Sequence, residues 1–438
     1  MADLGDLEVG DLVRIIKGDM VLEGIVMPAT EFTSNDVIIL KLSNGYNVGV
    51  SIRDAKVKVI KKSYVSIGHE SQQIKTCISG RGKLKLSLVS TGGTIVSKVE
   101  YETGAVKPAL TAPELIELAP ELLDEISELE VIELFRLLSE DLTPSHWSKI
   151  AEEVAKKIES GASGVIVAHG TDTISYTAAA LAFALRNLPC PVMLVGAQRS
   201  SDRPSTDSVL NLRACPVIAS RAPFGEVVVV MHGHTSDSYV LAHRGVKVRK
   251  MHSSRRDAFQ SINDVPLARV DFPEKKFKLL NKRYLSRSEP QFFIAKTKFS
   301  SKVALIKAYP GLDCELIDYL VDKGYEGIVI EGTGLGHVRQ ECINAVKRAC
   351  EDGVVIVMTS QTLFGRVNMK VYTNGRKLIL AGVVPGSDMI PETAYAKLSW
   401  LLANVEDRSE VKSLMMRNLV NEINEIHDIE TYPRWFHG

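Results

Sequence analysis

The sequence has no excess of charge, because its 53 lysine and arginine residues are matched by 53 aspartate and glutamate residues. A chain without net positive charge does not capture nucleic acid through bulk attraction, although it can still carry a local basic patch. Hydrophobic residues make up 45% and charged residues 24% of the chain, which is usual for a folded protein and excludes disorder. At roughly 100–200 residues per domain, the 438 residues are expected to form about two to four domains.

Long hydrophobic runs are also lacking. The longest apolar stretch, Thr177 to Leu185, is much shorter than the roughly 20 residues that a membrane-spanning helix needs. The first residues, MADLGDLEVG, are acidic and lack the basic and apolar regions of a secretory signal. We therefore expect a cytoplasmic protein without a membrane segment.

Cysteines are few, and no two of them form a Cys-x-x-Cys pair. The six cysteines are scattered at positions Cys77, Cys190, Cys215, Cys314, Cys342 and Cys350. Zinc sites need clustered pairs of ligands, so the spacing predicts no metal site. In a long chain of cytoplasmic composition, isolated cysteines are expected to be reduced thiols in the core.

Residues 1–78 are predicted to form a small all-β domain. Short runs rich in valine and isoleucine are separated there by glycine, asparagine and aspartate. The pair Asn44-Gly45 between two such runs is typical of a hairpin turn, because both residues tolerate positive φ. Short strands joined by tight turns indicate a small SH3-like barrel.

The pattern then changes to near-continuous apolar runs, such as SGVIVAHG and EVVVVMHG, that alternate with helical patterns such as HWSKIAEEVAKKIES. This alternation is typical of a doubly wound α/β fold with a parallel sheet. We assign residues 79–300 to one α/β domain, with residues 271–300 as a charged connection that is poor in strands. Residues 301–438 are assigned to a second, smaller α/β domain.

The second domain is expected to end in two helices, near Pro391–Asn404 and Ser409–Ile423. Its glycine run, Gly332–Gly336, follows an apolar strand and precedes a helical pattern, as in a dinucleotide-binding loop. The third glycine comes one residue too early for the GxGxxG pattern. A structural turn near the ligand cleft is therefore favoured over nucleotide binding.

Hydroxyl side chains follow two of the predicted strands, at the strand ends where open α/β sheets bind ligands. The first strand leads into Thr91–Thr94, in which two glycines let the backbone turn sharply and approach a ligand. A later strand leads into His169–Thr173, which opens a helix. Two simpler interpretations stay open, a plain Gly-Gly turn in the first case and a helix N-cap formed by Thr171 or Asp172 in the second.

A cationic run, KVRKMHSSRR at residues 247–256, follows a third strand. Such a run is usually a solvated surface, but one lysine placed next to Thr171 and Asp172 would complete a Thr–Lys–Asp relay. A threonine hydroxyl is a weak nucleophile until a neighbour takes its proton. A desolvated lysine can act as that base, and an aspartate can orient the lysine.

Taken together, TGGTI, HGTDT and RKMHSSRRDAF resemble the motifs of the bacterial-type L-asparaginase family of amidohydrolases. The run AGVVPGSDM at residues 381–389, followed by Pro391-Glu392, is similar to that family as well. The resemblance extends from about Lys83 to the C-terminus. It implies a two-domain, L-asparaginase-like, doubly wound α/β core behind the N-terminal β-barrel.

The resemblance also implies catalytic roles. Thr94 matches the primary nucleophile, which Tyr101 of the following lid would assist. Thr171, Asp172 and Lys250 match the second catalytic group. The alignment of the motif favours Lys250 over Lys247, although both lie in the cationic run.

Substrate-binding roles follow from the same resemblance. Ser139 and Glu140 fall in a run that is similar to the substrate-binding turn, where the serine holds the substrate's α-carboxylate. Asp172 is expected near the α-ammonium. Backbone N–H groups of the turns at Gly93 and Gly170 are expected to hold the oxyanion of an amide under attack. No metal or organic cofactor is implied for this chemistry.

Two departures separate the sequence from a free asparaginase. Family dimers commonly place a carboxylate of the neighbouring protomer beside the substrate's amine, but the corresponding stretch here, residues 365–370, has no acid. Free asparaginases also begin almost at the first core strand, whereas this chain has a β domain before it. An asparaginase-like core behind such a domain resembles the D subunits of archaeal glutamyl-tRNA(Gln) amidotransferases.

That second resemblance implies a glutaminase that supplies ammonia to a partner protein, the E subunit of the same amidotransferase. The partner would use ATP and magnesium to convert Glu-tRNA(Gln) into Gln-tRNA(Gln), and would also make most of the contacts with the tRNA. The expected assembly is a heterodimer with the partner subunit, or a heterotetramer in which a homodimer core of this chain is flanked by partner subunits. The alternatives are a free cytosolic L-asparaginase or glutaminase and, third, a non-catalytic module associated with translation.

Overall fold

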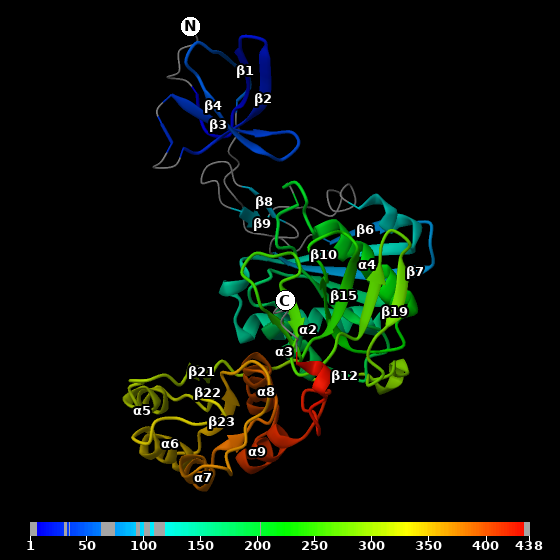
Figure 1. Cartoon of the computed structure of the whole chain (residues 1–438). Helices are drawn as coiled ribbons and strands as arrows, with labels where there is room; N and C mark the ends of the chain where they lie inside the picture. The colour runs from blue at the N-terminus through cyan, green and yellow to red at the C-terminus, as the bar shows by residue number, and fades with distance from the viewer. Residues whose placement is uncertain are drawn as a thin grey trace.

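The chain is described by a computed structural model, which shows an N-terminal sheet followed by two α/β domains (Figure 1). The structure describes residues 7–29, 33–34, 36–62, 75–92, 97–99, 106–108, 119–201 and 203–432. None of the helices in these ranges is both long and apolar enough to cross a membrane.

The N-terminal sheet is antiparallel, with strand order β4-β3-β2-β1-β5. Its strands are β1 (Leu12–Lys17), β2 (Met20–Met27), β3 (Val37–Leu42), β4 (Asn47–Ser51) and β5 (Lys56–Lys61). The predicted hairpin turn joins β3 to β4, and Gly45 has a φ of 84° there. Because alternate side chains of a strand point to one face, residues such as Val13 and Ile15 meet Leu40 in a core of their own.

The first α/β domain is built on a nine-stranded sheet of order β19-β18-β15-β14-β13-β11-β7-β10-β6. The five central strands, β14 to β10 in this order, are parallel, and antiparallel strands flank them. The bounds are β6 (Lys75–Ser79), β7 (Leu84–Gly92), β10 (Ile126–Leu137), β11 (Gly164–Ala168), β13 (Val192–Val195), β14 (Val227–His232), β15 (Tyr239–Arg244), β18 (Ala268–Asp271) and β19 (Lys276–Leu279).

Helices cover both faces of this sheet. They are α2 (Pro144–Glu159), α3 (Ile174–Ala184) and α4 (Ser208–Arg221). Within β11, Val165 and Val167 pack into the cluster that holds α2 and α3, whereas Ile166 packs into the cluster that holds α4. The apolar runs of the sequence are continuous because each of these strands is buried on both faces.

Short elements complete this domain. They are β8 (Ser97–Val99), β9 (Val106–Pro108), η3 (Pro120–Asp124), η4 (Ser139–Asp141), β12 (Leu185–Arg186), β16 (Val248–Lys250), β17 (Phe259–Ser261), η5 (Pro290–Phe292) and β20 (Ile294–Ala295). The prediction that residues 271–300 are poor in strands was wrong in part, because β19 extends the sheet beside β18 and β20 pairs with β12. Strand β19 lies at the sheet edge, and of its side chains only Phe277 packs inward. Its exposed lysines therefore leave no apolar run in the sequence that would predict a strand.

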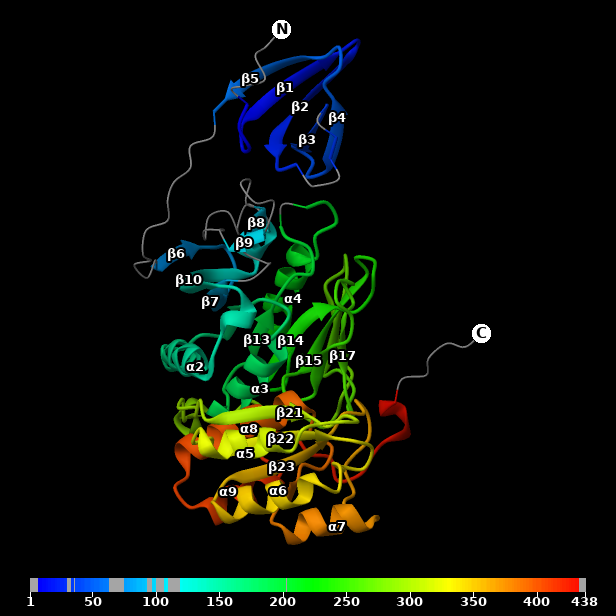
Figure 2. The same ribbon diagram turned by 90° about the vertical axis from the view of Figure 1, so that its left-hand side faces the viewer.

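The second α/β domain has a parallel four-stranded sheet of order β21-β22-β23-β24. Its strands are β21 (Val303–Lys307), β22 (Gly327–Gly332), β23 (Val355–Ser360) and β24 (Val384–Pro385). Its helices are α5 (Glu315–Asp322), α6 (Cys342–Glu351), α7 (Thr373–Leu380), α8 (Pro391–Asn404), α9 (Arg408–Met416) and η6 (Ile429–Thr431). Helix α8 packs against β22 of its own domain and also against α3 of the first α/β domain (Figure 2).

Two expectations for the second domain need correction. Helix α9 ends at Met416 rather than Ile423, because the buried ammonium of Lys397 binds the carbonyls of Met415 and Arg417 and the carboxylate of Glu422. The glycine run does not lead directly into a helix. It closes a turn in which Thr333 N donates to His337 O at 2.9 Å, and α6 begins only at Cys342.

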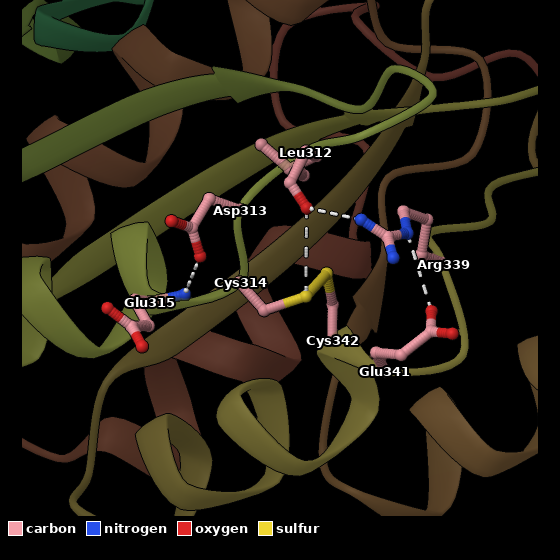
Figure 3. The surroundings of a disulfide bond; sticks show 7 residues. All are labelled: Leu312, Asp313, Cys314, Glu315, Arg339, Glu341 and Cys342. Atoms are coloured by element: carbon pink, nitrogen blue, oxygen red, sulfur yellow. Dashed lines mark hydrogen bonds and ion pairs between the residues drawn. A yellow bond between two sulfur atoms is a disulfide. The ribbon is translucent and has the colours of Figure 1, made fainter.

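The prediction that all six cysteines are reduced was wrong. Cys314, before α5, and Cys342, which opens α6, form a disulfide bond with their Cα atoms 4.9 Å apart (Figure 3). Helices α5 and α6 pack side by side on the sheet, so their N-termini meet although 28 positions separate the two residues. Cys190 and Cys215 are buried free thiols, as predicted, but the free thiols of Cys77 and Cys350 do not lie in the core, since Cys77 is exposed and Cys350 only partly buried.

Candidate active site

The carboxyl ends of β7 and β11 lie side by side in the first α/β domain, because these two strands are paired. Thr91 Oγ1, near the end of β7, donates to Ala168 O at the end of β11 over 3.0 Å. Gly92 has a φ of 101°, and a Cβ there would lie 2.3 Å from Leu137 O, so glycine is required by the neighbouring strand β10. Thr94, Gly93 and Tyr101 lie outside the described residues.

The structure brings together three of the predicted catalytic residues. Lys250 Nζ lies 2.9 Å from Thr171 Oγ1 and 2.8 Å from Asp172 Oδ1. The lysine side chain is 12% exposed and the aspartate side chain 69% exposed, while Thr171 is buried. Of the two candidate lysines, therefore, Lys250 faces the threonine. Lys247 instead forms a buried ion pair with Asp388 at 2.7 Å.

The alternative that Thr171 and Asp172 only cap a helix is wrong. Helix α3 begins at Ile174, and Thr173 holds its cap position. The Thr173 hydroxyl donates to Ser139 O at 2.7 Å rather than to the helix. Thr171 and Asp172 instead both contact Lys250, which is the arrangement that the predicted Thr–Lys–Asp relay requires.

The predicted substrate-binding turn lies against the same loop. Ser139 begins η4 and is 4% exposed. A Cβ added to Gly170 would lie 2.7 Å from Ser139 Cβ and 2.9 Å from Ser139 Oγ, so only glycine allows the two segments to approach so closely. Glu140 is exposed to solvent.

His169 supports this loop, and its place in the motif did not reveal that role. Its Nδ1 lies 2.7 Å from Gly170 O and its Nε2 lies 2.8 Å from Thr177 Oγ1. Since a carbonyl only accepts, Nδ1 carries the proton and Nε2 accepts from the threonine hydroxyl. Burial lowers the pKa of His169 to about 4. The imidazole is therefore neutral near pH 7 and fixes the carbonyl next to Thr171.

An open cleft of about 370 Å³ adjoins the lysine, and its lining includes Asp172, Ser175, Tyr176, Arg249, Lys250 and Glu392. Glu392 comes from α8 of the second α/β domain, which reaches the site here. Its Oε1 pairs with Arg249 at 3.1 Å, while its buried Oε2 has no hydrogen-bond partner among the described residues. Burial raises the pKa of Glu392.

Comparison with known proteins first defines the class. Residues 85–284 match the family model of the N-terminal asparaginase domain, and residues 302–415 match that of the glutaminase/asparaginase C-terminal domain. The thermostable L-asparaginase from Thermococcus kodakarensis is 29% identical with a TM-score of 0.70, and covers 78% of this chain and all of its own. L-asparaginase I from Vibrio cholerae is 29% identical with a TM-score of 0.67 and the same coverage. The core therefore has the asparaginase fold, and the predicted fold class is confirmed.

Relatives over the whole length define the family within this class. The glutamyl-tRNA(Gln) amidotransferase D subunit of Sulfolobus acidocaldarius is 51% identical over 433 residues, which are 99% of this chain and 95% of that protein. The D subunit of Pyrococcus horikoshii is 50% identical over 435 residues, 98% of each chain. Residues 7–60 match the GatD N-terminal domain model. The chain belongs to the family of glutamyl-tRNA(Gln) amidotransferase D subunits.

The expected family and the expectation of an enzyme are thereby confirmed. The roles assigned to single residues, the domain limits at residues 78 and 300, and the expected absence of a cofactor stay predictions.

Proposed function

We propose that this chain is the glutaminase of a Glu-tRNA(Gln) amidotransferase. It hydrolyses the side-chain amide of glutamine and supplies the ammonia to a partner, the E subunit. The partner uses ATP and magnesium to convert Glu-tRNA(Gln) into Gln-tRNA(Gln). The contact of Lys250 with both Thr171 and Asp172 supports this proposal most directly, because it assembles the proton-transfer group that amide hydrolysis needs.

In the proposed mechanism, the Thr94 hydroxyl attacks the amide carbon, and its proton is transferred to the amide nitrogen with assistance from Tyr101. The oxyanion is held by backbone N–H groups of the turns at Gly93 and Gly170. Collapse of this intermediate breaks the C–N bond, and the nitrogen leaves as ammonia after it receives a proton. Water then hydrolyses the threonine ester, and Thr171 and Lys250 move the protons. Nucleophile and base suffice, so the chain is proposed to need no cofactor.

The substrate would lie between the two loops. Ser139 is proposed to bind the α-carboxylate and Asp172 the α-ammonium, and Glu140 completes the same turn. The tight contact between Gly170 and Ser139 supports this assignment, because it places the proposed carboxylate-binding residue next to the proposed oxyanion site.

A free L-asparaginase or glutaminase is the second candidate, favoured by the likeness to solved L-asparaginases. Two observations weigh against it. The chain carries the N-terminal domain typical of the D subunits, and residues 365–370 lack the acid expected beside a free amino-acid substrate. The contact of Lys250 with both Thr171 and Asp172 weighs against a non-catalytic module, because it assembles the whole proposed catalytic group.

The proposed assembly in the cytoplasm joins this chain to the partner subunit, either as a heterodimer or as a heterotetramer with a homodimer of this chain at its core. With zero net charge, this chain would leave most contacts with the tRNA phosphates to the partner.

The test measures glutamine and asparagine hydrolysis by the chain alone and by its complex with the E subunit, Glu-tRNA(Gln), ATP and magnesium. Glutamine hydrolysis coupled to Gln-tRNA(Gln) formation is the expected result. Rapid asparagine hydrolysis by the isolated chain would instead favour the free asparaginase.

A further inference from the structure

The lysine of the proposed active site stands on a weakly supported element. Lys250 is the last residue of β16, which is only three residues long and forms a two-stranded sheet with β17. This hairpin is not part of the nine-stranded sheet that carries Thr171 and Asp172. The distance between the Lys250 amine and the Thr171 hydroxyl must therefore depend on what else holds the hairpin.

A buried ion pair holds the hairpin at its base. The side chains of Lys247 and Asp388 are both fully buried, with Nζ 2.7 Å from Oδ2. Asp388 also accepts from the backbone N–H of Asn424 at 3.0 Å and from its side-chain amide at 2.9 Å. The Asp388 carboxylate is thus held by Asn424 independently of its contact with Lys247, which is only three positions from Lys250 in the sequence.

Two further contacts come from the start of α8. The buried hydroxyl of Thr393 donates to Val246 O at 2.8 Å, and Glu392 pairs with Arg249 at 3.1 Å. The second α/β domain therefore holds residues 246, 247 and 249 of the strand that ends in Lys250.

The backbone just after the returning strand β17 is held by Asp388 of the same segment and by Gly365. The Asn263 side chain donates to Asp388 O at 3.1 Å and to Gly365 O at 3.0 Å, and its Oδ1 accepts from Gly365 N at 2.9 Å. Because both sides of the hairpin are bound, it cannot shift without breaking buried polar contacts, each of which is costly to lose.

We propose that residues 388–393, the anchor segment, position Lys250 for the reaction. Asp388 and Thr393 act through the hairpin backbone, which they fix so that the Lys250 amine stays within hydrogen-bond distance of Thr171. This proposal rests on the proposed function. It assigns to the second α/β domain a direct influence on the rate of glutamine hydrolysis, although the predicted catalytic residues lie in the first.

Thr393 offers a clean test, because its hydroxyl can be removed without changing the shape of the side chain. In Thr393→Val the bond to Val246 O is lost, whereas Thr393→Ser keeps the hydroxyl and loses a methyl group. Ser399→Ala is the matched control, since Ser399 lies on the same helix, is fully buried, and donates to a backbone carbonyl, Ser300 O at 2.7 Å. Glutamine kcat and KM would be measured in the complex with the E subunit and Glu-tRNA(Gln), together with Tm.

We expect Thr393→Val to lower kcat at least about ten-fold with little change in KM, because displacements near 1 Å can cost about 100-fold in rate. Thr393→Ser should retain most of the wild-type kcat, and Ser399→Ala should lower Tm without lowering kcat. If the wild-type complex is active and Thr393→Val and Ser399→Ala have equal kcat, the anchor proposal is overturned while the proposed function stands. A wild-type complex without glutamine hydrolysis would overturn the proposed function as well.

Discussion

The Lys250 amine lies 2.9 Å from the Thr171 hydroxyl, although 79 positions separate the two residues in the sequence. The contact joins the loop that follows β11 to a hairpin held by the other α/β domain. In the proposed mechanism, the contact with Asp172 orients this amine for proton exchange with the threonine.

Removal of this amine should separate the two halves of the proposed reaction. In Lys250→Ala, glutamine-dependent formation of Gln-tRNA(Gln) should fall by several orders of magnitude, because the proposed base is lost. Thr94→Val should have the same effect through loss of the proposed nucleophile. Added ammonium salts should restore amidation in both variants, measured as Gln-tRNA(Gln) formed. If ammonium fails to restore it, these residues serve the partner site or the assembly instead.

Substitution of Gly170 should impair the site through geometry alone. A Cβ in Gly170→Ala would press on Ser139 at 2.7 Å and separate the two loops, so glutamine kcat/KM should fall at least about ten-fold. The control is Gly324→Ala. Gly324 has a φ of 72°, and a Cβ added there would meet only open space. The left-handed backbone of this alanine should cost roughly 1–2 kcal/mol of stability and leave activity intact. Equal activity in the two variants would contradict the assigned role of this turn.

The buried His169 should make stability depend on pH. Its pKa is lowered to about 4 in the folded state, against about 6.5 in the unfolded chain. Between these two pH values the unfolded state binds more protons than the folded state. The stabilisation that the neutral His169 contributes is therefore complete above pH 6.5 and is lost as pH falls through about 4. As pH is lowered across this range, His169 alone should reduce the free energy of unfolding by up to about 1.4 kcal/mol for each pH unit.

The variant His169→Gln isolates this contribution. Unfolding in urea, measured at several pH values from 7 to 5, should show a shallower decrease for the variant than for the wild type. His243, whose pKa burial lowers to about 3, is present in both proteins and serves as the constant background. Parallel curves would mean that His169 is not buried in its neutral form.

The disulfide bond should stabilise the second α/β domain without affecting catalysis. The bond between Cys314 and Cys342 spans 28 positions, and closing a loop of that size destabilises the unfolded state by about 3.6 kcal/mol through lost chain entropy. Cys314→Ser combined with Cys342→Ser should lower Tm and leave glutamine kcat unchanged. Thiol titration of the unfolded, unreduced wild type should count four free cysteines, and a count of six would contradict the bond.

The sequence predicted best what is local along the chain. Continuous apolar runs located central strands such as β11 and β14 but not the flanking strands such as β15 and β18, and motif spacing placed Thr171 and Asp172 at a strand end. Choosing Lys250 over Lys247 required the family resemblance, because both lysines lie in one charged run. Their different partners, Thr171 and Asp388, come from distant segments.

What the sequence did not predict depends on contacts between distant segments. The disulfide forms because two helices pack side by side, which no cysteine spacing shows. Glu392 was noted only as part of a motif, and its ion pair with Arg249 requires the two domains to meet. The polar support from His169 was missed since a buried imidazole looks the same in sequence as an exposed one.

The hydrophobic core that contains α3 and α8 has a consequence for how the molecule unfolds. Phe183 of the first α/β domain stacks on Trp400 of the second, and one continuous cluster includes both. Neither α/β domain can be cut away without exposing this shared apolar surface to water, which costs about 25 cal/mol for each Å². Two halves expressed as separate chains should therefore recover a stable fold only when mixed, as complementing fragments of a single cooperative unit.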